Sequence, residues 1–554
     1  MTLLTIADQL SKIPGEGISI ERMDGDTLVA RVNSAGLVAT VQYLRDRMNA
    51  RFMYSVGEDA RQQNGCLAVN QVFSLDRDGA FVVLRTDVDP ADPNVPSITS
   101  LIPAANWHER EVRDLIGISP LGHPDPRRLV LPDDFPEGVY PLRHDFHYDE
   151  HPPVEIHKVE LKTPPPGASL FPIGPFYPTL EEPVFINLFV EGEHIVGMDY
   201  RGFYAHRGIE KLGDSKLTYQ QVPQIAERIC GICGFVHSTT YCQTVEKAAG
   251  IEIPERARYV RTILLELERV HSHLLWLGLA CHFIGFDTLF MQAWRIREPV
   301  MWLTEYMTGN RKTYGINKIG GLTRDLPADA REQILPVIDR IEGQVMQVVD
   351  AILQDGSLAA RLQGSGILTP EDARDYCVIG PTARGSGLDV DVRRDHPFAA
   401  YAGLDLEVCV ENGCDSWART MVRIREMSVS IRLLRQALDQ LPGGEIAAEI
   451  DSIAPYQVGI SAVEAPRGEV SHYVMTGTDQ RPARWRVRAP SYNNLQIIPA
   501  MLRGMTIADA PISIGSLDPC FSCTERMGVI DRSAGTVRIY GREELLEMSQ
   551  QKGR

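Results

Sequence analysis

Four cysteines stand in two CxxC pairs, and these pairs are the part of the sequence best suited to chemistry. The first pair is Cys230 and Cys233, and the second is Cys520 and Cys523. Close thiolate pairs form a soft donor set that suits zinc or an iron–sulfur cluster. A zinc ribbon usually places its pairs about 15–20 residues apart, and a thioredoxin-like site needs a single pair. Most of a domain separates these pairs, so the spacing disfavours a ribbon. Chemistry alone leaves a structural zinc or iron–sulfur site open.

Charged residues frame both pairs in a fixed order. Arg228 and His237 flank the first pair, and Asp518 and Arg526 flank the second. The resulting patterns, RxCGxCxxxH and DPCxxCxxR, resemble the two signature motifs of NiFe hydrogenase large subunits. Both motifs are complete and stand in the order of that family.

The resemblance implies a Ni–Fe(CO)(CN)2 centre held by all four cysteines. Cys230 and Cys520 would be terminal ligands of nickel, while Cys233 and Cys523 would bridge nickel and iron. Maturation enzymes would supply the carbon monoxide and cyanide of the iron. His237 would donate a hydrogen bond to a bridging sulfur, a contact that tunes a metal from outside its ligand set. A lone histidine is by default a satisfied core residue, but its place in the motif favours the metal site.

Two further segments match this family. In EAPRG at 464–468, the family places the arginine, here Arg467, over the open nickel–iron edge, where a fixed guanidinium would polarise H2 or draw its proton away. The segment GPFYPTLEEP at 174–183 matches the one that carries the proton-relay acid, which leaves Glu181 and Glu182 as equal candidates. A relay carboxylate needs a pKa tuned toward neutral. Without the resemblance, these features would be a surface ion pair and an exposed acidic turn.

The end of the chain resembles an extension that a dedicated protease removes after nickel loading. It comprises the 28 residues that follow Arg526. We therefore expect cleavage between Arg526 and Met527. An ordinary C-terminal strand and helix is the alternative.

The remainder of the chain resembles complex I. Residues 106–146 look like the signature of its 30-kDa subunit, and residues 380–401 are common to its 49-kDa subunit and these hydrogenases. One hypothesis is a hydrogenase coupled to a complex I-like membrane arm, as in formate hydrogenlyase. The other is a fused 30-kDa/49-kDa subunit of an NADH:quinone oxidoreductase-like complex without nickel. The cysteines favour the hydrogenase, because complex I subunits have lost them. A non-catalytic scaffold is disfavoured, because four unused thiolates invite oxidation.

The resemblance also implies partners. These are an iron–sulfur small subunit, a ferredoxin-like electron-transfer subunit, complex I-like membrane subunits, and a maturation chaperone and protease. The iron–sulfur clusters would lie on the small subunit, since the six remaining cysteines of this chain lack cluster spacing. The electron donor stays open among formate dehydrogenase, ferredoxin and a CO-oxidising enzyme. The fused N-terminal region favours formate, because the CO-linked relatives resemble the unfused large subunit.

Charge and hydropathy narrow the setting. The net charge of −17 disfavours nucleic acid, whose binders carry basic patches. The start of the chain lacks a secretory pattern, and we find no run of about 18 apolar residues that would span a membrane. We expect a cytoplasmic protein that lies peripherally on the cytoplasmic face of the inner membrane through its partners.

The elements that must position these residues predict an α+β fold. Strand-like runs at 27–33 and 80–88 and a helix at 34–48 capped by Ser34 indicate a small N-terminal α+β domain. Two strands are expected within 184–201, hinged at Glu191-Gly192. The predicted divisions are a 30-kDa-like domain at 1–150, a Pro-rich linker at 151–173, a catalytic domain at 174–526 and the extension at 527–554.

Helical spacing dominates the catalytic region over 217–355 and 408–441. His271 and His273 lie in the first of these stretches. Residues two apart on a helix point in nearly opposite directions, so these two histidines cannot chelate a metal together. We expect them to be structural or interface residues.

Overall fold

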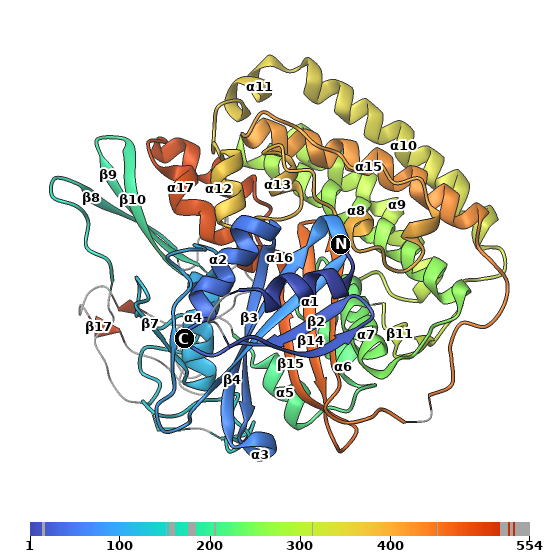
Figure 1. Cartoon of the computed structure of the whole chain (residues 1–554). Helices are drawn as coiled ribbons and strands as arrows, with labels where there is room; N and C mark the ends of the chain where they lie inside the picture. Colours follow the sequence, from blue (N-terminus) through green and yellow to red (C-terminus); the bar gives the residue numbers. More distant parts are fainter. Residues whose placement is uncertain are drawn as a thin grey trace, which may run out of the picture.

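The computed structural model describes residues 1–13, 17–150, 152–153, 161–174, 184–203, 206–312, 314–450, 452–520, 530–531 and 536–537. An N-terminal sheet domain lies against a larger, mainly helical module (Figure 1). The predicted α+β class is confirmed. Among the described residues, no helix combines the length and the apolar character needed to cross a membrane.

The N-terminal domain is built on a five-stranded sheet in the order β1-β2-β5-β4-β3. Only β2 and β5 pair in parallel within it. The strands predicted at 27–33 and 80–88 are confirmed as β2 and β5. The elements are α1 (Leu3–Ser11), β1 (Ser19–Asp24), β2 (Thr27–Arg31), α2 (Leu37–Met48), β3 (Arg51–Ala60), α3 (Arg61–Asn64), β4 (Cys66–Leu75), η1 (Asp76–Asp78), β5 (Ala80–Val88), β6 (Asn94–Pro96), α4 (Ala105–Ile116) and β7 (Ser119–Leu121).

The predicted cap of the first long helix is wrong. Helix α2 begins at Leu37, and its N-cap residue is Gly36 rather than Ser34, with no capping bond from a side chain. The side chain of Asn33 instead accepts the N–H of Gly36 at 2.7 Å. An asparagine that bonds the backbone ahead of it favours a turn over helix, so the helix starts later than predicted.

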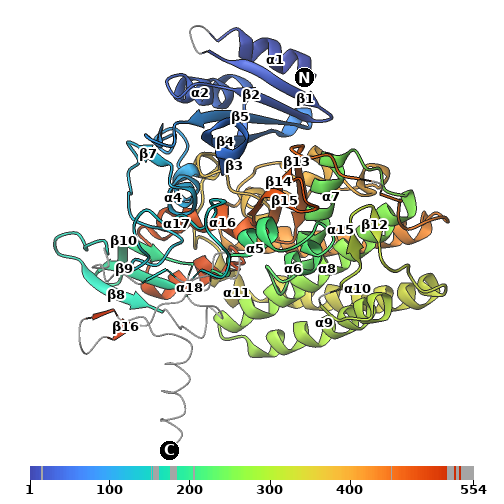
Figure 2. The same cartoon turned by 90° about the horizontal axis from the view of Figure 1, so that it is seen from below.

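Both faces of this sheet are buried. Helices α1 and α2 pack on one face through residues such as Leu10 and Leu44. The opposite face, which includes Met53 and Val83, shares one apolar core with Val470 of the helical module. Figure 2 shows the N-terminal domain stacked directly on that module. The domain is therefore part of the framework around the site.

The module begins with an antiparallel sheet of three strands in the order β10-β9-β8. These strands are β8 (Ser169–Ile173), β9 (Phe185–Glu191) and β10 (His194–Arg201). The two strands predicted within 184–201, and the turn between them, are confirmed. Strand β8 was not predicted, because it comes from the Pro-rich segment.

Long helices form the body of the module. Helices α8, α9, α10 and α15 lie side by side (Figures 1 and 2), which confirms the predicted helical stretches. The elements up to α15 are α5 (Ile209–Ser215), α6 (Val222–Ala226), α7 (Gly234–Ala249), α8 (Glu255–Phe283), α9 (Asp287–Thr308), β11 (Asn317–Lys318), β12 (Gly321–Leu322), α10 (Ala330–Gln354), α11 (Gly356–Leu362), α12 (Pro370–Asp375), α13 (Pro381–Arg384), α14 (Val392–Asp395), η3 (Tyr401–Gly403) and α15 (Ser416–Asp439).

A second three-stranded antiparallel sheet, in the order β13-β14-β15, packs against α7. It brings the end of the chain close to the first cysteine pair. The remaining elements are β13 (Val458–Ala465), β14 (Gly468–Thr476), β15 (Pro482–Arg488), α16 (Pro490–Asn494), η4 (Leu495–Ile497), α17 (Ile498–Leu502), η5 (Ile507–Asp509), α18 (Ala510–Gly515), β16 (Ile530–Asp531) and β17 (Thr536–Val537).

Candidate metal centre

Cysteines from distant parts of the chain meet in the interior. The Sγ atoms of Cys230 and Cys520 are 3.2 Å apart, although 290 residues separate them. Cys233 is the residue just before α7. Its N–H and that of Ile232 both lie 3.4 Å from the Cys230 sulfur. All three cysteines are at least 97% buried. The fold thus joins the first predicted pair to the first cysteine of the second pair.

This donor set fits a thiolate-binding metal. The neighbouring Cys230 sulfur raises the pKa of the Cys233 thiol, and burial and the Cys520 sulfur raise it further. Gathered thiolates repel one another, and a bound cation offsets this repulsion by replacing their protons. The described residues contain no complete set of three metal-binding side chains. The predicted ligand Cys523 lies outside the described residues, as do Glu181, Glu182, Arg526 and Met527.

Arg467 lies beside these sulfurs, in the turn between β13 and β14. Its Nε and Nη2 atoms donate to the backbone and carboxylate oxygens of Asp518 at 2.8 and 2.6 Å, and Nη1 donates to Ser272 Oγ at 3.2 Å. Burial works against the charge of the guanidinium. The Asp518 carboxylate and the cysteine sulfurs outweigh burial and raise the pKa of Arg467. The residue is therefore a fixed cation at the site.

Close backbone contact holds this turn in place. Gly468 has a φ of 125°, a conformation that is costly for residues with a side chain. Gly380 approaches the same turn so closely that a Cβ atom on it would lie 2.3 Å from the Gly468 Cα. These two glycines explain why the EAPRG segment needs its final residue.

His237 lies in α7, one turn after Cys233. Its Nδ1 atom is 3.3 Å from Nε2 of His472. Its own Nε2 atom is buried and has no partner among the described residues. Burial lowers the pKa of His237 to about 4, against the opposing charge of the Cys230 sulfur, so the ring is neutral near pH 7.

A buried acid and a lysine hold the first cysteine loop. The two carboxylate oxygens of Glu268 accept the N–H groups of Phe235 and Val236 at 3.1 and 3.0 Å. A carboxylate is favoured at a helix N-terminus because it complements the helix dipole. Lys312 donates to the carbonyl of Ile232 at 2.6 Å and lies 3.8 Å from Glu268. Burial raises the pKa of Glu268 to about 7.

The two histidines of α8 have separate partners, as expected. His271 Nε2 lies 2.8 Å from an Arg297 nitrogen. His273 Nε2 lies 2.8 Å from a Glu426 carboxylate oxygen. They belong to the framework on opposite sides of the helix.

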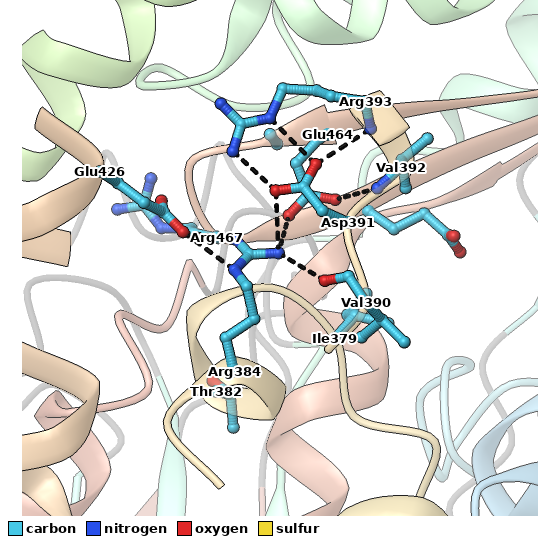
Figure 3. Close-up of polar contacts among 12 residues, drawn as sticks. Ile379, Thr382, Arg384, Val390, Asp391, Val392, Arg393, Glu426, Glu464 and Arg467 are labelled. Atoms are coloured by element: carbon cyan, nitrogen blue, oxygen red, sulfur yellow. Dashed lines mark hydrogen bonds and ion pairs between the residues drawn. The ribbon is translucent and has the colours of Figure 1, made fainter. Parts of the chain in front are cut away.

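Behind the Arg467 turn lies a buried ion network (Figure 3). Arg384 contacts Glu426 at 2.7 Å and Glu464 at 2.9 Å. Arg393 contacts Asp391 at 2.7 Å. The sequence gave no sign of this network. We define it as Arg384, Asp391, Arg393, Glu426 and Glu464, all at most 2% exposed.

The network also secures the backbone of the EAPRG segment. Glu464 receives the Arg384 guanidinium on its carboxylate. Arg269 donates to the backbone oxygens of Glu464 and Ala465 at 2.7 and 3.1 Å. Arg467 is thereby fixed from behind by groups that do not face the cysteines.

Family models match most of the chain. Residues 30–152 match the 30-kDa subunit of respiratory-chain NADH dehydrogenase, and residues 284–459 and 451–526 match its 49-kDa subunit. Residues 207–283, which contain the first cysteine pair, match nickel-dependent hydrogenase. The predicted fused order is confirmed.

Individual relatives agree with these matches. Formate hydrogenlyase subunit 5 of Escherichia coli (strain K12) is 44% identical over 94% of this chain and 92% of its own length. Membrane-bound hydrogenase subunit alpha of Pyrococcus furiosus is 39% identical over 69% of this chain and 92% of its own length. A chain in the structure of the membrane-bound sulfane sulfur reductase, an archaeal respiratory membrane complex, has a TM-score of 0.62 at 28% identity. It covers 65% of this chain and 99% of that chain.

The fold and the gathered cysteines define the large subunit of a nickel-dependent hydrogenase related to the complex I 49-kDa subunit. The chain belongs to the family of formate hydrogenlyase-type hydrogenase large subunits. It is the catalytic subunit of an oxidoreductase that reversibly reduces protons to H2 at a nickel–iron centre. The hypothesis of a quinone-site subunit without nickel is thereby set aside.

Proposed function

We propose that this chain produces H2 within a formate hydrogenlyase complex on the cytoplasmic face of the inner membrane. The observation that carries the proposal is the meeting of Cys230 and Cys520 at 3.2 Å beside the anchored Arg467. The relative from the formate system spans 94% of the chain, whereas the Pyrococcus hydrogenase spans 69%. That difference supports the formate-linked assignment over a ferredoxin-linked or CO-linked one.

The proposed partners follow from this assignment. They are an iron–sulfur small subunit that delivers electrons, a ferredoxin-like subunit, complex I-like membrane subunits and formate dehydrogenase. A maturation chaperone and protease would act before assembly. The iron–sulfur clusters would lie on these partners.

We assign the four cysteines as the metal ligands. Cys230 and Cys520 would be terminal on nickel, and Cys233 and Cys523 would bridge nickel to an iron that carries carbon monoxide and two cyanides. When bound, this centre supplies the two-electron chemistry that joins 2H+ and 2e− into H2. Soft thiolates suit these metals.

The protein side chains would supply charge and protons. Arg467, a buried cation held by Asp518, would stabilise negative charge that develops at the open edge of the centre. Glu181 or Glu182 would carry protons between a terminal thiolate and the exterior. His237 would donate to a bridging sulfur through its buried Nε2 atom.

An infrared spectrum of the anaerobically purified complex tests this assignment. We expect bands of metal-bound carbon monoxide and cyanide, where protein absorbs little. Cys230→Ser should abolish the bands and the nickel. Cys242→Ser is the matched control, because Cys242 is equally buried in α7 but lies outside both motifs. Absence of the bands from a processed wild-type chain would reject the nickel–iron assignment.

Maturation makes a separate prediction. The mature chain should end at Arg526, without the 28 residues from Met527 onward. The intact mass of the same sample measures this directly. An active complex whose large subunit still ends at Arg554 would contradict the cleavage.

A further inference from the structure

Three aromatic side chains form a buried hydrogen-bonded chain that ends at the metal site. Trp485 Nε1 donates to His472 Nδ1 at 3.3 Å. His472 Nε2 is 3.3 Å from His237 Nδ1. All three side chains are completely buried. The last atom of the chain, Nε2 of His237, has no partner among the described residues.

The fold fixes the order of these residues. His472 lies in β14 and Trp485 lies in β15, where their backbone partners across the strands are Val487 and Val474. Residues displaced diagonally by two positions project from the same face of a sheet. That face packs against α7, which carries His237. Tyr241, one turn further along α7, packs edge-on against Trp485 at 5.3 Å and holds the indole in place.

The chemistry of tryptophan sets every proton in this chain. An indole nitrogen can only donate, so His472 Nδ1 must accept. Burial keeps the pKa of both histidines below the usual range, so each ring carries one proton near pH 7. The proton of His472 is therefore on Nε2, from which it donates to His237 Nδ1. The proton of His237 is then on Nε2, the atom that has no partner.

We infer that Trp485 and His472 are positioning residues that fix the tautomer of His237, so that its Nε2–H is presented as a donor to a cysteine sulfur of the metal centre. A partner on the far nitrogen commonly selects the tautomer of a histidine beside a metal. This inference rests on the proposed assignment of the cysteines as ligands. Neither Trp485 nor His472 belongs to a cysteine motif.

The test compares variants that keep or remove the donor to His237. His472→Gln retains an amide N–H that can donate to His237 Nδ1, whereas His472→Leu has no donor. Trp485→Phe removes only the first N–H. A thiolate that loses a hydrogen bond donates more charge to its metal. The carbon monoxide and cyanide bands should therefore move to lower frequency in His472→Leu and Trp485→Phe and stay near wild type in His472→Gln.

His237→Leu provides the full shift against which the others are scaled. Nickel per chain and the midpoint of thermal unfolding are measured on every sample. We expect nickel to fall by about 10- to 100-fold in apparent affinity where the donor is lost, as for other groups next to metal ligands. His472→Gln should retain wild-type nickel content.

Defined results would overturn the inference. Equal shifts in His472→Gln and His472→Leu would show that packing matters and the donor does not. Unshifted bands in Trp485→Phe or in His237→Leu would also reject it. If both His472 variants bind no nickel while Trp485→Phe is unchanged, the chain is structural only. Missing bands in the wild type would instead reject the nickel–iron assignment, so the two failures are distinguishable.

Discussion

The metal site and the buried ion network lie on two sides of one short segment, and they differ in how their polar atoms are satisfied. Arg467 faces the cysteines, while Glu464, three residues earlier, joins the network. Around Arg467, His237 Nε2 and an Asp518 oxygen have no partner in the described part of the chain. No member of the network has such an atom there. Buried polar atoms are normally paired, so the unpaired ones mark where a ligand is accepted and the paired ones mark framework.

Removing a network cation should have the largest effect on stability. Arg384→Met would leave the carboxylates of Glu426 and Glu464 in the interior without their partner. Breaking a buried pair on one side costs about 3–5 kcal/mol. We expect a loss of this size in the free energy of unfolding, measured by urea denaturation. Adding Glu426→Gln should recover part of the loss, and a change below about 1 kcal/mol would argue against a framework role.

A change on the other side of the segment should affect catalysis instead. Arg467→Lys keeps the charge but cannot reproduce the double contact with Asp518, because an ammonium lacks the planar fork of a guanidinium. We expect H2 production to fall by about 10²–10³-fold, which is typical for the loss of one preorganised charge contact. Nickel per chain should stay at the wild-type value. Full activity in this variant would remove Arg467 from the mechanism.

The pH dependence of stability sharpens the same comparison. Burial raises the pKa of Glu464 from 4.5 to about 7. A carboxyl group with a higher pKa when folded stabilises the fold most below its unfolded pKa, and this contribution is lost as the pH rises through the folded value. Relative to Glu464→Gln, the wild type should lose about 1–2 kcal/mol between pH 5 and pH 7.5. Parallel pH curves of urea denaturation for the two proteins would contradict this shift.

An exposed ion pair provides the smallest expected effect. Arg331 and Asp439 lie 2.6 Å apart, with 61% and 54% of their side chains exposed. Surface pairs of this kind contribute about 0–1 kcal/mol. Arg331→Ala should therefore leave urea denaturation and H2 production nearly unchanged. A loss as large as that of Arg384→Met would show that the burial of the network is not what gives it its strength.

The sequence predicted features whose signal is local. The two cysteine motifs, the strands at Thr27–Arg31 and Ala80–Val88 and the long helices each have a pattern within a few turns of chain. The Ser34 cap failed because Asn33 competed for the backbone. The pairing of Arg384 with Glu464 joins residues 80 positions apart, and no local pattern encodes such a contact.

The same reasoning separates what was found at the site from what was missed. His237 was predicted because it stands inside a motif. His472 lies 235 residues away from it, and Lys312 lies 80 residues from the loop that it holds. Each looks like an ordinary polar residue in its own neighbourhood. Only the folded chain shows that their nitrogen atoms reach the cysteine loop and the histidine of the motif.

The contact between the N-terminal sheet and the last strands has a consequence for synthesis on the ribosome. Arg51 and Tyr54 bond to Glu469 and Ser471 across 418 and 417 residues. The N-terminal domain emerges first, yet the surface that covers its second face is among the last parts to be translated. That apolar face stays open to water for most of the elongation time. The nascent chain therefore needs a temporary cover there, and the order of translation, more than final stability, sets when this protein is most prone to aggregate.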